Sequence, residues 1–245
     1  MDTLTVFYGL LFVVAFLYAA VGHGGASGYL ALMAIYGVAP EVMKPTALLL
    51  NLFVSLMAFL QFYRGRHFNW KIFLPLALAS IPTAYLGGSL SLESGIYKKL
   101  LGLLLLFPVL RFFFFSQKEE TELRSSHRYG SVLIGACIGF VSGLIGIGGG
   151  ILLSPLLLLL KWTDQKQTAA ISALFIFVNS LSGLVGQLNK GIQFSEEMIS
   201  MVLVAFAAGC LGAWMGSLKF RQAVLKNILA VVLSLASFKL LFTNA

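Results

Sequence analysis

Charged residues are scarce in this sequence. Of its 245 residues only 11% are charged and 59% are hydrophobic, whereas about a quarter of the residues of a soluble domain are charged. This balance argues against a soluble globular protein. The nine Asp and Glu residues all fall at the ends of apolar stretches or between them, which excludes a carboxylate within a membrane helix of the kind that relays protons.

Cysteines and clustered basic residues are scarce too. The two cysteines, Cys137 and Cys210, each stand alone within an apolar stretch, so they show neither metal-ligand spacing nor a disulfide framework. The 17 Lys and Arg residues form no basic run and no basic face interleaved with aromatic residues, so the pattern of a nucleic-acid-binding surface is missing. We therefore expect no metal, no cofactor and no nucleic-acid partner.

Apolar stretches, by contrast, fill the chain. They lie at 4–21, 27–38, 46–63, 72–90, 96–115, 130–145, 151–160, 169–188, 198–218 and 224–243. About 20 helical residues cross the core of a bilayer, so most stretches suffice, but 27–38 and 151–160 reach little more than halfway. Backbone at membrane depth must bond internally, which favours helices. The sequence predicts an all-α, polytopic membrane protein whose first stretch, lacking the basic flank of a signal peptide, is retained.

The basic residues indicate how the chain crosses the membrane, and we expect all charges to lie in loops. If each half contributes five segments, one side receives Lys44, Lys98, Lys99, Lys190 and Lys239, and the other receives the remaining 12 of the 17. If the short stretches only continue the preceding spans, the split is about nine against eight. Because basic loops stay in the cytoplasm, we expect five segments per half, both termini outside the cytoplasm and an inverted second half. The expected location is a bacterial inner (plasma) membrane.

An internal repeat supports the division into halves. Val-Gly-His-Gly-Gly-Ala at 21–26 aligns with Ile-Gly-Ile-Gly-Gly-Gly at 145–150, and Thr-Ala-Leu at 46–48 aligns, two residues out of that register, with Ser-Ala-Leu at 172–174. Inverted repeats with interrupted helices are typical of secondary transporters, which bind substrate where the repeats meet. The predicted parts are a first repeat (1–116), a cytoplasmic connector loop (117–129) and a second repeat (130–245).

A glycine cluster lies in each half between a long and a short apolar stretch. Consecutive glycines interrupt a helix, and the N–H groups that open the next helix lack partners and carry the positive end of its dipole. Two such ends facing one cavity would bind an anion. Tight helix packing is the competing interpretation of glycines spaced four apart. We favour packing for Gly212 and Gly216, and a binding site for the two aligned clusters.

Polar residues near the clusters complete a predicted uncharged site. Thr46 and Ser172 are expected at the starts of their helices, where their hydroxyls would donate hydrogen bonds. His23 is the histidine within a predicted break, and both proton coupling and simple packing are left open for it. The predicted substrate-binding residues are Gly22, His23, Gly24, Gly25, Ala26, Ser27, Thr46, Asn51, Gly146, Gly148, Gly149, Gly150, Ser172 and Asn179.

These motifs resemble a known family. A Gly-x-Gly-Gly cluster, a short apolar helix and a Thr/Ser-Ala-Leu helix, all repeated, are similar to the sulfite exporter TauE/SafE family of membrane permeases, with 143–150 as the nearest match. The resemblance covers nearly the whole chain. It implies a duplicated helical fold and transport of sulfite, a sulfonate, thiosulfate or a related anion. The first cluster departs from the family pattern at His23, Ala26 and Ser27.

Two alternatives to an anion permease are left open. Residues 25–28 match the Gly-x-Ser-Gly of rhomboid-like intramembrane proteases, but a nucleophilic serine needs a base within reach, and His67 and His127 are expected in cytoplasmic loops. We expect no enzyme, and Ser27 is better interpreted as a helix cap or an anion contact. A passive anion channel would use the same lining. The expected partners are a small, sulfur-containing anion and membrane lipid, with homo-oligomerisation left open.

Overall fold

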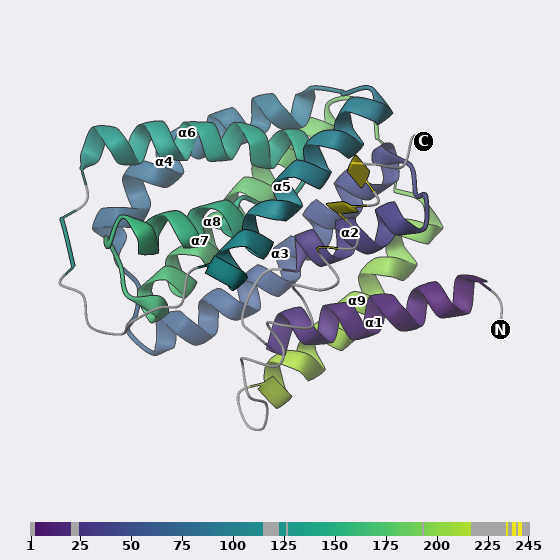
Figure 1. Cartoon of the computed structure of the whole chain (residues 1–245), viewed down its shortest axis with the longest axis horizontal. Helices are drawn as coiled ribbons and strands as arrows, with labels where there is room; N and C mark the ends of the chain where they lie inside the picture. Colours follow the sequence, from purple (N-terminus) through teal and green to yellow (C-terminus); the bar gives the residue numbers. More distant parts are fainter. Residues whose placement is uncertain are drawn as a thin grey trace.

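The computed structural model contains helices and no strand over the residues that it describes. These are 3–20, 25–114, 123–125, 127–192, 194–216 and the single positions 234, 237, 238, 240 and 241. The helices are α1 (Thr3–Ala20), α2 (Ala26–Ile35), α3 (Pro40–Arg64), α4 (Trp70–Ser89), α5 (Ser94–Phe114), α6 (Arg128–Ile145), α7 (Gly150–Leu159), α8 (Gln165–Leu188) and α9 (Glu196–Gly216) (Figure 1). The predicted tenth segment, 224–243, lies almost wholly outside the described residues.

The helices match the predicted apolar stretches. The two short helices, α2 and α7, have 10 residues each and correspond to the predicted short stretches 27–38 and 151–160. Helices α3, α4, α6 and α8 are each long and apolar enough to cross a membrane. The α3 helix begins at Pro40, earlier than the apolar stretch from 46 indicated, because proline suits the first turn of a helix. The prediction of a polytopic helical membrane protein is confirmed.

Helices α4 and α6 form the most extensive helix contact in the described structure. Leu76 lies beside Gly135 and Ala84 beside Gly143, so residue numbers rise together and the two helices run parallel. The glycines let the backbones touch, because no side chain stands between them. Figure 1 shows this pair along one edge of the molecule.

Helices α1 and α9 form an equivalent pair along the opposite edge (Figure 1). The hydroxyls of Tyr8 and Ser200 are hydrogen bonded and Gly212 lies against the backbone of Phe16, so this pair is parallel too. Along the two halves, α1 corresponds to α6 and α4 to α9. Each pair therefore joins the first helix of one half to the fourth of the other, which is the exchange that a two-fold relation produces. The packing interpretation of Gly212 is confirmed.

The corresponding helices α3 and α8 meet at the centre and run antiparallel. Asn51 lies next to Ser180 and Leu48 next to Gly183, so residue numbers rise along one helix and fall along the other. Corresponding helices thus point in opposite directions, as an inverted repeat requires. The exact repeat boundaries remain predictions, because the connector at 117–129 is described only at 123–125 and 127–129.

Helix α7 turns back instead of continuing α6. Gly150 lies against Ile176 and Ser154 next to Ser172, so α7 runs antiparallel to α8, whereas α6 and α8 run in the same direction (Figure 1). Since Gly150 is level with the middle of α8, α7 is a half-length helix that starts near the centre. Helix α7 therefore ends on the side of the molecule where α6 begins. Because α6 and α7 count as two segments rather than one, this arrangement gives the odd number of segments that the sequence predicted for each half.

Connections at the two ends of the helices differ in how many basic residues they carry. The α3–α4 connection follows Arg64, and the backbone N–H of Arg124 donates to the carbonyl of Lys161 at 2.7 Å, which places the connector beside the α7–α8 turn. We call this the basic end. At the opposite end, Lys190 donates to the hydroxyl of Ser91 at 2.6 Å, joining the α8–α9 and α4–α5 connections. The first residues of α1 lie at this opposite end (Figure 1).

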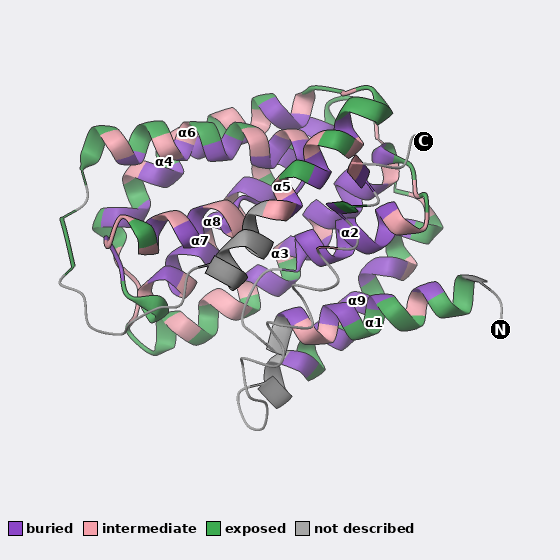
Figure 2. Ribbon diagram, viewed as in Figure 1, coloured by how far each residue is buried: buried purple, intermediate pink, exposed green. Residues whose placement is uncertain are grey.

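Burial is arranged as expected for a protein surrounded by lipid. The central helices α3 and α8 are buried over much of their length, whereas outer helices expose apolar side chains (Figure 2). Leu78 of α4, Leu133 of α6 and Leu203 of α9 are 70%, 68% and 63% exposed. Lipid tails are as apolar as leucine, so such side chains are stable on an outer face in a membrane.

Candidate functional site

The second glycine cluster breaks the helical path between α6 and α7. Gly146, Gly148 and Gly149 have φ angles of 90°, 71° and 79°, a left-handed conformation that residues with a side chain rarely adopt. The predicted interruption is therefore present. Glycine is needed at these positions because the chain reverses direction within four residues, between Ile145 and Gly150.

Polar side chains of α3 and α8 adjoin this break. A Cβ atom added to Gly148 would lie 2.7 Å from Nδ2 of Asn51 and 3.0 Å from Oγ of Ser180. These two side chains are fully buried and hydrogen bonded, with Nδ2 of Asn51 donating at 3.3 Å. The structure thus brings the predicted Asn51 to the predicted second cluster, and Ser180 with it.

Ser142 and Phe175 flank the break at Gly149. A Cβ atom there would lie 2.9 Å from Cε1 of Phe175 and 3.3 Å from Cβ of Ser142. Sequence interpretation missed Ser142, although it lies one helical turn before Gly146, whose N–H donates to its carbonyl at 2.7 Å. Polar residues one turn from a glycine cluster share its face of the helix, and that spacing was the available signal.

Three buried oxygen atoms in this region have no hydrogen-bond partner among the described residues. They are Oγ of Ser142 and Oδ1 of Asn51 and Asn179, in side chains that are 0% exposed. Asn179 adjoins Ser180 on α8, and its Nδ2 donates to the carbonyl of Phe175 at 2.8 Å, which leaves its Oδ1 as a free acceptor. Buried polar atoms without partners are rare in folded proteins, so each of them requires an explanation.

The start of α7 adds unpaired backbone donors. The N–H groups of Leu152 and Leu153 both donate to the carbonyl of Gly149, at 3.1 Å and 3.0 Å, and Gly149 has no side chain to cap the helix. The N–H groups of Gly148, Gly149 and Gly150 have no backbone acceptor within the described residues. Donors at a helix N-terminus attract anions. The break therefore combines such donors with buried side-chain oxygens.

The hydroxyls of Thr46 and Ser172, which were predicted to donate to the substrate, both have hydrogen-bond partners within the protein. The hydroxyl of Thr46 donates to the carbonyl of Val42 within its own helix at 2.6 Å, and the hydroxyl of Ser172 accepts from that of Ser154 at 2.8 Å, which joins α8 to α7. The prediction that Thr46 and Ser172 begin their helices is wrong, because α3 and α8 begin more than a turn earlier.

The first glycine cluster is described only from Gly25 onward. Gly25 is the N-cap of α2, with a φ of −78° and no side-chain cap, and Ala26 is buried beside it. The hydroxyl of Ser27 is hydrogen bonded to that of Tyr18 at 2.8 Å. The prediction that Ser27 caps a helix is wrong, because Gly25 is the N-cap and α2 already begins at Ala26. The predicted site residues outside the described chain are Gly22, His23 and Gly24.

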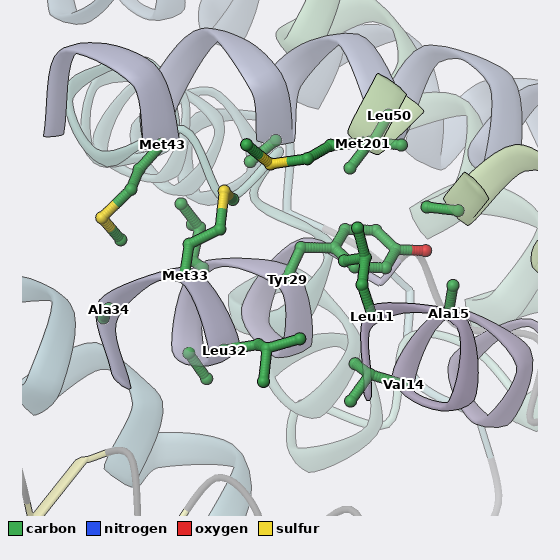
Figure 3. Close-up of a cluster of buried hydrophobic side chains, with 14 of the residues drawn as sticks. Leu11, Val14, Ala15, Tyr29, Leu32, Met33, Ala34, Met43, Leu50 and Met201 are labelled. Carbon is green, nitrogen blue, oxygen red and sulfur yellow. The ribbon is translucent and has the colours of Figure 1, made fainter. Parts of the chain in front are cut away.

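Tyr29 is a polar residue at the first cluster that sequence interpretation missed. Its ring lies against Gly25, one helical turn away, and its hydroxyl is buried without a partner in the described part of the chain. Figure 3 shows the ring among apolar side chains that include Leu11 and Met201. A lone aromatic residue in a short apolar helix was the sequence signal, and it is easily mistaken for core.

Lys44 contradicts the expectation that every charge lies in a loop. It is within α3, because that helix begins at Pro40, and its side chain is only 6% exposed. Its ammonium donates to the carbonyls of Gly87, Gly88 and Leu90 at the end of α4.

Comparison with known proteins matches residues 7–240 to a family described as "Sulfite exporter TauE/SafE". "Probable membrane transporter protein y4hK" of Sinorhizobium fredii is 36% identical over 241 residues, 94% of this chain and 95% of that protein. "Probable membrane transporter protein YunE" of Bacillus subtilis is 27% identical over 228 residues, 84% of this chain and 82% of that protein. "Sulfite exporter TauE/SafE family protein 5" of Arabidopsis thaliana is 33% identical over 95 residues, 39% and 21% of the two chains. No solved structure matches.

The protease alternative finds no support in these relatives, which are named as transporters rather than enzymes. The helices long enough to cross a membrane agree with that function. Since the family match covers nearly the whole chain, this protein belongs to the sulfite exporter TauE/SafE family of membrane transporters.

Proposed function

We propose that this transporter moves a small sulfur-containing oxyanion, such as sulfite, a sulfonate or thiosulfate, and binds it at the break between α6 and α7. The observation that carries the proposal is the set of buried polar atoms without partners around Gly148 and Gly149. The names of the family and of the Arabidopsis relative support a sulfur oxyanion as the substrate class.

The donors of the break suit an oxyanion. A hydrogen bond to a charged group contributes about 1.5–3 kcal/mol, and a helix N-terminus stabilises a nearby anion by about 0.3–1 kcal/mol, or about 2 kcal/mol when partly buried. The N–H groups of Gly148, Gly149 and Gly150, with the hydroxyl of Ser142, replace part of the hydration that the anion loses. Binding at the break then needs no basic side chain in direct contact.

Asn179 favours a substrate that also carries a hydrogen-bond donor. Its free Oδ1 is an acceptor, since its Nδ2 is already bonded to the carbonyl of Phe175, and an acceptor repels a bare anionic oxygen. An oxyanion with an O–H or N–H group, such as hydrogensulfite or an amino-sulfonate, satisfies both kinds of atom at the site.

The inverted halves supply a route for alternating access. The break lies beside the contact between the corresponding helices α3 and α8, and secondary transporters bind substrate at such a junction. Movement of one half against the other exposes the break first to one end of the helices and then to the other.

Purified protein in liposomes is expected to exchange radiolabelled sulfite, sulfonates or thiosulfate with saturable kinetics. Unlabelled substrate inside the vesicles should accelerate uptake of labelled substrate, because the carrier can then return to the outward-facing state with substrate bound instead of empty. Empty liposomes are the control. Flux that does not saturate and shows no such acceleration would favour a channel, and the absence of flux for every sulfur oxyanion would refute the proposed function.

We also propose that the basic end faces the cytoplasm, because basic loops are retained there, and that the protein resides in the inner membrane of a bacterium. Cys137 and Cys210 are first replaced by alanine, and single cysteines are then introduced as Lys166→Cys and Lys190→Cys. A membrane-impermeant maleimide should label the Lys190→Cys protein in intact cells and the Lys166→Cys protein only after permeabilisation. The reverse pattern would show that the orientation is wrong.

A further inference from the structure

Lys44 is a buried basic residue whose hydrogen-bond partners are uncharged backbone carbonyls. Its Nζ lies 3.3 Å, 3.2 Å and 3.2 Å from the carbonyl oxygens of Gly87, Gly88 and Leu90, and the side chain is 6% exposed. These carbonyls close the C-terminal end of α4, where a positive charge is favourable. They satisfy the donors of the ammonium but do not neutralise its charge.

The same side chain adjoins the break. A Cβ atom added to Gly146 would lie 3.0 Å from Cγ of Lys44 and 3.1 Å from its carbonyl oxygen. Lys44 and Asn51 are two turns apart on α3, about 10 Å along the axis, and both adjoin the same break. The charge therefore lies on the side of the break that faces the opposite end, and Asn51 lies deeper.

The second half has no equivalent charge. The register that aligns α2 with α7 pairs Lys44 with Thr168, and the register that aligns Thr46 with Ser172 pairs it with Ala170. The two-fold relation thus holds for the helices but not for this residue. A feature present in one half only is not required by the packing that both halves share.

The attraction between a charged Lys44 and an anion in the break is stronger than it would be in water, because the protein interior has a lower dielectric constant. With an effective dielectric constant of about 20 and a separation of about 10 Å, Coulomb's law favours binding of a monovalent anion by about tenfold and of a divalent anion by about a hundredfold. This attraction acts without direct contact, so it operates while the ammonium stays bonded to α4.

We propose that Lys44 is the residue that selects for negative charge at this binding site, attracting the substrate from the side of the opposite end. The inference rests on the function proposed above, and it assigns the preference for anions to one positioned charge in addition to the backbone donors of α7.

The test separates charge from helix capping. In Lys44→Gln the amide can still donate to the α4 carbonyls, whereas in Lys44→Arg the charge is kept. The matched control is Gln187→Leu, because Nε2 of Gln187 donates to the same Gly88 carbonyl at 2.7 Å and carries no charge. Transport of methanesulfonate, a monovalent anion, and of thiosulfate, a divalent one, is measured in liposomes, with thermal unfolding of each variant.

Lys44→Gln is expected to raise the KM about tenfold for methanesulfonate and about a hundredfold for thiosulfate, while Lys44→Arg stays close to the wild type. Gln187→Leu should unfold at a lower temperature with both KM values unchanged. An active Lys44→Gln protein with an unchanged KM ratio would overturn this inference alone, and so would the same KM change in Gln187→Leu. If Lys44→Gln does not assemble, Lys44→Met is the second neutral variant. A wild type that moves no sulfur oxyanion overturns the proposed function, and the inference with it.

Discussion

Replacing Gly148 by alanine is expected to abolish transport, or to raise the KM at least about a hundredfold, in protein that still folds. The added Cβ would lie 2.7 Å from Nδ2 of Asn51 and 3.0 Å from Oγ of Ser180, so the break or these side chains must move. Losing one or two hydrogen bonds to a charged ligand, at about 1.5–3 kcal/mol each, produces a change of that size. Transport in liposomes and direct binding by calorimetry measure it.

The control must share the backbone strain of the variant without its contacts. Gly191 has a φ of 78°, close to the 71° of Gly148, and a Cβ atom there would meet nothing within 4 Å. Gly191→Ala should therefore cost about 1–2 kcal/mol of stability for its left-handed backbone and leave transport intact. If Gly148→Ala behaves like Gly191→Ala, glycine at 148 serves only the conformation of the chain, and the break is not the binding site.

Composition and glycine placement were enough to predict the fold class and the position of the break between α6 and α7. The first predicted break lies mostly outside the described residues. Long apolar stretches have one stable backbone form in lipid, so the helices followed from length alone. The starts of the short helices α2 and α7 were predicted to within one residue, because consecutive glycines interrupt a helix, whereas the end of α2 was placed three residues too late. The basic residues predicted the inversion, since their distribution between the two sides favours an odd number of segments in each half and does not depend on how the helices pack.

Residues that depend on contacts between distant segments were not predicted. Lys44 looked like a surface charge, because nothing in the sequence shows that the end of α4 would cover it. Ser142 and Tyr29 looked like ordinary residues of apolar helices, and only burial without a partner distinguishes them. Thr46 was given a role that its own helix removes, since its hydroxyl donates to Val42. The pairing of α1 with α9 was also invisible, because it joins opposite ends of the chain.

Replacing Gly143 by leucine is expected to prevent correct assembly. A Cβ atom at Gly143 would collide with the carbonyl of Ala84 and lie 2.8 Å from the backbone N of Gly88, so the clash is with main chain that no rotamer change relieves. Overpacking usually costs about 1–3 kcal/mol, and separating two helix backbones should cost more. The expected result is loss of a single symmetrical peak in gel filtration in detergent, with no transport.

Gly9→Leu is the matched control, because a Cβ atom at Gly9 of α1 meets nothing within 4 Å and the added side chain faces lipid. It should purify and transport like the wild type. The two-fold relation makes a stronger demand: Gly212→Leu, which collides with the backbone of Phe16, should damage the α1–α9 pair as severely as Gly143→Leu damages the α4–α6 pair. Equal loss of assembly in both variants supports the view that the α4–α6 and α1–α9 pairs are equivalent and that both depend on close contact at glycine. If leucine is tolerated at Gly143 or Gly212, other side chains must already keep the helices of that pair apart.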